Sequence, residues 1–251
     1  MPVAQPFSTL IEVVNKIAQS VGHPATTDVA GSQDEAILRI AYYVNIACTE
    51  MAYMTNWQWL SRTGTITLAA DYDGQPEKAF DLPPDYHAMT DDTMWNRNTQ
   101  LPGIGPINAQ DWQWLIVRQT MITTRTMWRI RDKKLWVKSP PSAASPQTFS
   151  FEYLSRFWAV DGETAAPIDY MNSNPDYHLY PWQLPILYGR AKFFENEGYD
   201  STAAYADFNR AFAYEAGTDK AATALPLVPG QGYPYIDAVK NVPDTGYGSG
   251  S

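Results

Sequence analysis

The spacing of hydrophobic residues at the start of the chain predicts two helices in succession. From Phe7 to Val21 the apolar residues recur at the three- and four-residue steps that keep one helical face buried, and Gly22 follows as an expected C-terminal cap. The stretch from Ser32 to Leu60 predicts a longer helix, which runs from Asp34 to Asn56 and stops at Trp57-Gln58-Trp59-Leu60. Its apolar stripe is made of Ile37, Ile40, Ala41, Val44, Ala47, Cys48 and Met51. Ser32 and Glu35 have the spacing of a capping box, which predicts that Ser32 caps this helix. We expect this helix to be the spine on which other elements pack.

After this helix the spacing changes from helical to alternating, which predicts antiparallel strands. Residues 65–68 and 79–82 are expected to pair as a hairpin around a turn at residues 71–74. The prolines of Leu82-Pro83-Pro84-Asp85-Tyr86 end it, because proline cannot donate to a strand ladder. A second hairpin is predicted around Asp132-Lys133, with one face formed by Trp128, Ile130, Leu135 and Val137.

Further elements are predicted on either side of the second hairpin. Residues 87–98 have an ambiguous pattern, in which Met89, Thr93 and Trp95 favour a strand. Residues 108–117 favour a short helix. A further strand is predicted from the aromatic alternation of Phe149, Phe151, Tyr153 and Phe157. Helical spacing returns from Leu184 to Phe194, and another helix is expected from Asp200 or Ser201 to Gly217.

These elements predict an α+β, mainly α, fold: a bundle of about four helices from both chain ends with an inserted small antiparallel β-sheet and an extended C-terminal tail. We expect residues 1–61 and 176–222 to form the helical bundle, residues 62–175 the inserted antiparallel β region, and residues 223–251 an extended C-terminal arm. The arm is rich in Pro, Gly and Tyr and has no usable period, so it is expected to be held by neighbouring chains. Its predicted partner-interface residues are Leu225, Leu227, Tyr233, Tyr235, Ile236 and Tyr247.

Composition favours a protein whose surface is covered by partners. Charged residues make up only 18% of the chain, while hydrophobic residues make up 45%. The formal net charge of -9 argues against nucleic-acid binding, which depends on Lys and Arg contacts to phosphates. No signal peptide and no apolar run of membrane-spanning length is recognised, so we expect no membrane partner.

The sequence offers no constellation for catalysis, so no catalytic residue, cofactor or metal site is predicted. Its single cysteine, Cys48, lies on the buried stripe of the long helix and is expected to be a core residue. His23, His87 and His178 are isolated and are interpreted as loop histidines. Asp91-Asp92 is interpreted as a solvated turn. Trp57 and Trp59 are expected to lie in the core.

The order of several motifs resembles the head-to-tail adaptor (connector) proteins of tailed bacteriophages. A helical hairpin ends in Asn56-Trp57-Gln58-Trp59-Leu60, and Phe80-Asp81-Leu82-Pro83-Pro84-Asp85-Tyr86 follows. Trp128-Arg129-Ile130 and Leu135 to Pro140 are similar to the family's later hairpin, and Leu184 to Phe212 is similar to its closing helix pair. The resemblance covers most of residues 7–217.

The resemblance implies a structural virion protein without catalysis, located at the head-tail junction and assembled in the host cytoplasm. Such a protein forms a homo-oligomeric ring, usually a dodecamer, between the portal protein and the tail tube or nozzle protein. The C-terminal arm would reach into the portal, and genomic DNA would pass through the lumen without specific binding. Because the chain has a negative net charge, we also expect that the lumen is not lined by Lys and Arg.

Three other functions stay open at this point. One is a tail tube or nozzle component of the same virion. Another is a carbohydrate-binding, receptor-binding module, which would need several coplanar exposed aromatic side chains on the sheet. The third is an enzyme such as a cell-wall hydrolase, which would need an acid, nucleophile or metal constellation.

Overall fold

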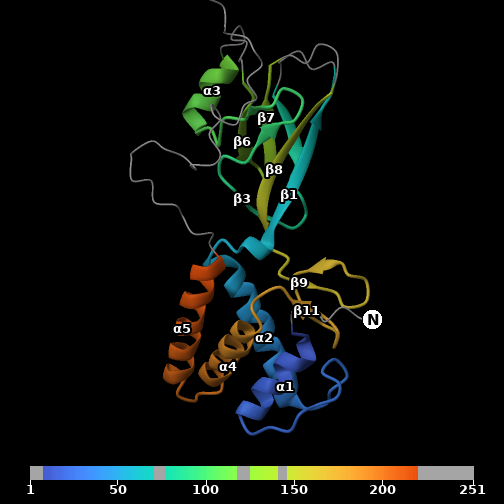
Figure 1. Cartoon of the computed structure of the whole chain (residues 1–251), viewed down its shortest axis with the longest axis vertical. Coiled ribbons are helices and arrows are strands. Elements are labelled where there is room, and N and C mark those ends of the chain that lie inside the picture. Colours follow the sequence, from blue (N-terminus) through green and yellow to red (C-terminus); the bar gives the residue numbers. More distant parts are fainter. Residues whose placement is uncertain (1–7, 71–76, 118–124, 141–145, 220–251) are drawn as a thin grey trace, which may run out of the picture.

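The helices at the two ends of the chain pack together in the computed structural model, which describes residues 8–70, 77–117, 125–140 and 146–219. The described residues form an α+β protein with five helices and three small antiparallel sheets. Figure 1 shows an elongated molecule with most of the helices at one end and the larger strands at the other. Four helices meet at the helical end: α1 (Leu10–Ser20), α2 (Glu35–Met54), α4 (Gln183–Asn196) and α5 (Thr202–Asp219).

The predicted helix-loop-helix at the start of the chain is confirmed by α1 and α2, which pack on each other. The predicted capping box on α2 is wrong. Asp34 is the N-cap, and its carboxylate accepts a hydrogen bond from the Ala36 amide at 3.0 Å. Ser32 instead accepts from the Asp34 amide at 3.1 Å, and Glu35 forms an ion pair with Arg39, so neither residue is left to form the box.

Helix α2 ends at Met54, two residues before its predicted end at Asn56. A separate 3₁₀ turn, η1 (Gln58–Leu60), follows it and leads directly into the first strand. The indole N–H of Trp57 donates to the Met51 carbonyl at 2.8 Å, which satisfies a group at the end of the helix. The chain therefore turns from the helical end into the β end around one buried tryptophan.

One core holds the helical end together, and it includes residues of one of the three sheets. The buried stripe of α2 meets α1 and α4, and α4 in turn packs on α5. Gly189 of α4 makes this approach close, since a Cβ there would lie 2.9 Å from Ile17 and 3.0 Å from Val44. The side-chain amide of Asn45 exchanges hydrogen bonds with both main-chain groups of Met171. This contact ties the loop before α4 to α2.

The larger sheet is centred on its longest strand, β8 (Gln147–Ser155). It pairs with β1 (Ser61–Leu68), β3 (Tyr86–Met89) and β4 (Trp95–Asn96), and β4 pairs with β5 (Leu101–Pro102). The second sheet has the order β2 (Lys78–Asp81), β7 (Lys134–Lys138) and β6 (Met127–Arg131). The smallest sheet, which lies beside the helices, contains β9 (Ala159–Val160), β10 (Pro167–Ile168) and β11 (Tyr177–His178).

The predicted pairing of residues 65–68 with 79–82 is wrong. The first of these strands, β1, pairs with β8, and the second, β2, pairs with β7. The larger and second sheets share one core, in which Ile66 and Phe149 come from one sheet and Leu135 and Val137 from the other. Burying both inner faces against each other therefore separates two strands that are neighbours in the sequence.

The second predicted hairpin is confirmed. β6 and β7 pair around Asp132 and Lys133, which have φ of 53° and 57°. Two residues with positive φ form the turn whose twist suits a two-residue hairpin. The aromatic strand is confirmed as β8, although Phe157 lies beyond its end. The single predicted sheet is wrong, because three sheets are present, and the turn at residues 71–74 lies outside the described residues.

Candidate functional site

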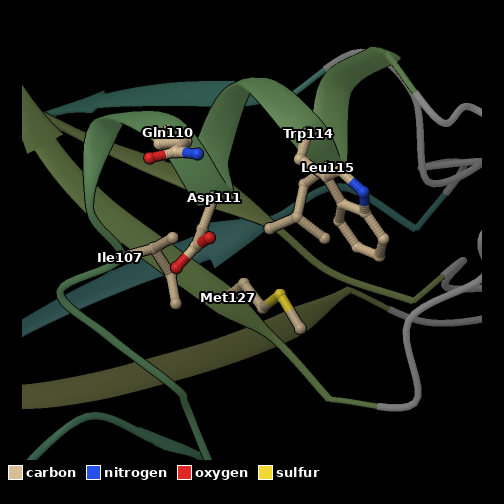
Figure 2. Close-up of a pocket in the computed structure, with 6 residues that line it drawn as sticks. All are labelled: Ile107, Gln110, Asp111, Trp114, Leu115 and Met127. Carbon is tan, nitrogen blue, oxygen red and sulfur yellow. The ribbon is translucent and has the colours of Figure 1, made fainter.

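An open pocket of about 390 Å³ lies between helix α3 (Ala109–Val117) and the start of β6. Figure 2 shows Asp111, Trp114 and Leu115 extending from the helix towards Ile107 and Met127. Gln110 completes the lining. The walls are mainly apolar, and Asp111 is the ionisable side chain among these residues.

Helix α3 is held in place at both ends. At its start Asn108 accepts a hydrogen bond from the Asp111 amide at 2.8 Å and donates its side-chain amide to the Asp111 carboxylate at 2.7 Å. In its last turn the Leu115 carbonyl accepts from the ammonium of Lys138 at 2.8 Å. Lys138 is only 2% exposed, and burial lowers its pKa. The cation is well placed there, because the C-terminal end of a helix carries partial negative charge.

The inner and outer faces of α3 differ in what they contact. Trp112 and Leu115 are buried against the β region, whereas Trp114 is 46% exposed at the rim of the pocket. An indole at the rim of an apolar pocket suits the binding of an apolar side chain from another protein. The lining does not bring together a nucleophile and a base, so its chemistry favours binding rather than reaction.

Exposed large hydrophobic side chains are spread over both ends of the molecule. In the described residues they are Leu38, Tyr42, Tyr53, Met54, Trp59, Trp95, Leu101, Ile104, Trp114, Val117, Tyr170, Trp182, Tyr199 and Tyr214. Most of them are aromatic, and Tyr and Trp are enriched at protein interfaces. By contrast, among the Phe, Tyr and Trp residues on the described strands only Trp95 is exposed, at 42%, which gives little of the flat platform that a carbohydrate-binding sheet needs.

The structure separates the two tryptophans that were both expected in the core. Trp57 is fully buried and contacts the rings of Tyr180 and Phe212. The prediction for Trp59 is wrong, since its side chain is 49% exposed. Cys48 lies in the core as predicted, where burial raises the pKa of its thiol well above the usual value.

Two of the three histidines are not in loops. His23 follows the end of α1 in a loop, as predicted, and lies 3.6 Å from Asp34. His87 lies on β3 with an exposed side chain, and its ring contacts Tyr53. His178 lies on β11 and is completely buried, with no hydrogen-bond partner for either ring nitrogen in the described residues. Burial lowers its pKa to about 4, with a smaller contribution from Lys16, although the Tyr180 main chain acts in the opposite direction.

Sequence reasoning missed the role of Asp85, which lies in the proline-rich segment just before β3. The Asp85 side chain is buried and accepts hydrogen bonds from Tyr153 at 2.9 Å, Ser155 at 2.7 Å and Arg62 at 3.0 Å. Burial of Tyr153, together with its hydrogen bond to Asp85 and the negative charge of that carboxylate, raises the pKa of Tyr153 to about 12. Asp85 therefore joins β1, β3 and β8 where the β end meets the helical end, a role that only the spatial neighbours reveal.

The remaining site predictions fall into two groups. Asp91 and Asp92 lie in an exposed turn, as predicted. The predicted partner-interface residues Leu225, Leu227, Tyr233, Tyr235, Ile236 and Tyr247 lie outside the described residues. Within the described ranges, no cluster of three or more His, Cys, Asp or Glu side chains could hold a metal ion. No helix in the same ranges has both the length and the apolar character required to cross a bilayer.

Neither a comparison with models of protein families nor one with curated proteins gives a match for this chain.

Proposed function

We propose that this chain is a structural virion protein, a head-to-tail adaptor that forms a ring between the portal and the tail tube or nozzle. Its copies would pack side by side in a homo-oligomer, with a dodecamer as the expected form. The C-terminal arm would dock on the portal protein, and genomic DNA would pass through the lumen without specific binding. The protein itself would bind and position other proteins and would catalyse no reaction.

The observation that carries this proposal is the exposed aromatic surface on both ends of the molecule. Trp59, Trp114, Trp182 and Tyr214 are each close to half exposed or more, and they lie on different elements. A protein surrounded by copies of itself and by two further rings needs binding surface on several sides. The low charged fraction of 18% agrees with such a covered surface.

The order of the elements is a second line of support. The helical hairpin of α1 and α2, the strands and the closing pair of α4 and α5 follow one another in the order on which the family resemblance rests. In this proposal the helices form a four-helix bundle from residues 1–61 and 176–222, and residues 62–175 form the insertion. Asp85 belongs to the Leu82-Pro83-Pro84-Asp85-Tyr86 motif of that resemblance, and its buried hydrogen bonds give the motif a structural role.

The net charge of -9 bears on how DNA would pass through such a ring. A lumen rich in Lys and Arg would retain the phosphate backbone, because each phosphate that such a side chain neutralises releases counterions and so favours binding. An acidic protein repels DNA at longer range and allows it to move. The chain as a whole is suited to passage rather than to capture.

Quantitative mass spectrometry of purified phage particles tests the proposal by counting copies of this chain and of portal protein. We expect equal copy numbers, because the adaptor ring matches the portal ring. The same particles treated to separate heads from tails should keep the chain bound to portal-containing heads. A chain that is missing from particles, or that occurs once per particle, would refute the adaptor function.

A further inference from the structure

Strand β1 forms an edge of the larger sheet, and one side of this strand is open. Its eight residues pair in continuous antiparallel register with β8, from Ser61 opposite Leu154 to Leu68 opposite Gln147. No other strand in the described ranges pairs with β1. Alternate residues of an antiparallel strand point their N–H and C=O groups away from the paired neighbour, so about half of these groups face the open side.

The β1 edge lacks the features that usually protect an exposed strand from further pairing. Its sequence contains no proline and no lysine, and no bulge interrupts its pairing with β8. Its charged residue, Arg62, directs its guanidinium to the buried Asp85 at 3.0 Å. The exposed face consists largely of threonines, which favour the extended conformation. A long, regular and weakly charged edge of this kind is a template for another strand.

The other edges of the two main sheets differ from β1 in this respect. β5 has two residues and ends in Pro102. β2 has four residues, with the charged side chains of Lys78 and Asp81 at its ends. The outer side of β6 is covered in part, since the Trp128 amide donates to Ile104 and the Trp128 carbonyl accepts from Ile107, both at 3.0 Å. In the described part of these sheets, β1 therefore stands out as a long edge without protection.

The C-terminal segment of the chain begins beside β1. Helix α5 ends at Asp219, whose carboxylate accepts a hydrogen bond from the Gln58 amide at 2.7 Å. Gln58 lies in the 3₁₀ turn that leads into β1 at Ser61. Asp219, the residue from which the C-terminal segment continues, therefore lies near the start of the open edge.

One stretch of the C-terminal segment has the composition of a strand. Residues 235–242, Tyr-Ile-Asp-Ala-Val-Lys-Asn-Val, contain neither glycine nor proline and lie between Pro234 and Pro243. Prolines at both ends would stop a ladder after a length equal to that of β1. We propose that, in the free protein, residues 235–242 add to the open edge of β1 of the same chain as a further strand.

The length of the connection permits this pairing. Residues 220–234 span up to about 50 Å when extended at roughly 3.4 Å per residue, whereas β1 itself is about 27 Å long. A short connection of this kind holds the segment at an effective concentration of about 1 mM, well above that of a second copy in dilute solution. The chain's own segment therefore competes best for the edge until a partner such as the portal takes up the arm.

Hydrogen exchange of the complete protein, read by mass spectrometry, tests this pairing. We expect the β1 peptide to be protected in the full chain and to exchange roughly tenfold faster in Val239→Pro, because proline removes a ladder hydrogen bond and distorts the added strand. A chain lacking residues 223–251 should show the same increase. The β8 peptide should stay protected in all of these proteins, which verifies that the sheet is intact.

Gln231→Pro is the matched control, because it places a proline in the connection and should leave β1 protected. Equal β1 exchange in the full chain, Val239→Pro and the shortened chain would overturn the proposal. Protection of β1 that increases with protein concentration would assign the edge to a second copy and would also overturn it. Since the experiment uses no portal, its result is independent of the copy-number test of the adaptor function.

Discussion

Acidification should destabilise this protein through one histidine, His178. The side chain is fully buried on β11, where neither ring nitrogen has a described hydrogen-bond partner, and its pKa falls from 6.5 to about 4. In the unfolded chain the imidazole returns to water and gains a proton below about pH 6.5. Between these two values the unfolded state binds more protons than the folded state, so the free energy of unfolding decreases as the pH falls.

The size of the effect follows from the difference between the two pKa values. A fall from 6.5 to about 4 corresponds to roughly 3 kcal/mol at about 1.4 kcal/mol per pH unit. The contribution of neutral His178 to the free energy of unfolding is complete above about pH 6.5, decreases between pH 6.5 and pH 4, and is lost near pH 4. Below that value both states carry the proton, and His178 has no further effect on stability.

Urea denaturation at pH values spaced between about 7.5 and 4 measures this loss, with tryptophan fluorescence as the signal. His178→Phe removes the titrating group and keeps an aromatic ring beside Tyr180, whose centroid lies 6.4 Å away. Carboxylates titrate in both proteins, so the difference between the two stability curves isolates His178. His87→Phe, on the exposed side of β3, is the control. Parallel curves for the native chain and His178→Phe would refute the reasoning.

Three further substitutions probe the packing. Asp85→Asn should lower the free energy of unfolding by about 2–4 kcal/mol, because it disrupts a buried network, whereas exposed Asp81→Asn should change it little in urea denaturation. Gly189→Leu should lower the free energy of unfolding by about 1–3 kcal/mol, since even a Cβ would lie 3.0 Å from Val44. An unchanged melting temperature would contradict this packing. Lys138→Met should lower the free energy of unfolding by about 1–2 kcal/mol and speed hydrogen exchange in α3, because it removes the hydrogen bond to the Leu115 carbonyl. Unaltered exchange in α3 would argue against a role of this bond in holding the helix.

The parts of the fold that could be predicted are those whose signal is local. The hairpin of β6 and β7 has both alternating runs and both turn residues, Asp132 and Lys133, within one short stretch. The helices likewise reveal their buried stripes by periodicity alone. The partner of β1 could not be predicted in this way, because β8 lies much later in the chain and pairing depends on which two faces share a core.

The candidate site was harder to predict than the fold. Trp57 and Trp59 are two positions apart, yet one is buried and the other half exposed, because the 3₁₀ turn directs them to different sides. The pocket beside α3 joins residues such as Asp111 and Met127 whose proximity no sequence spacing indicates. Buried His178 was missed for a related reason, since a two-residue strand carries too short a pattern to predict burial.

The placement of the strands between the two halves of the helical core has a consequence for the order of folding. Strands β1 to β8 lie in one continuous stretch, whereas α2 finds its partner α4 only after that stretch has ended. During synthesis the complete β end leaves the ribosome while α1 and α2 still lack half of their core. Closing the helical end then requires contacts between residues far apart in sequence, such as Asn45 with Met171. We therefore expect the inserted strands to acquire their structure first and the helical core to form last and more slowly.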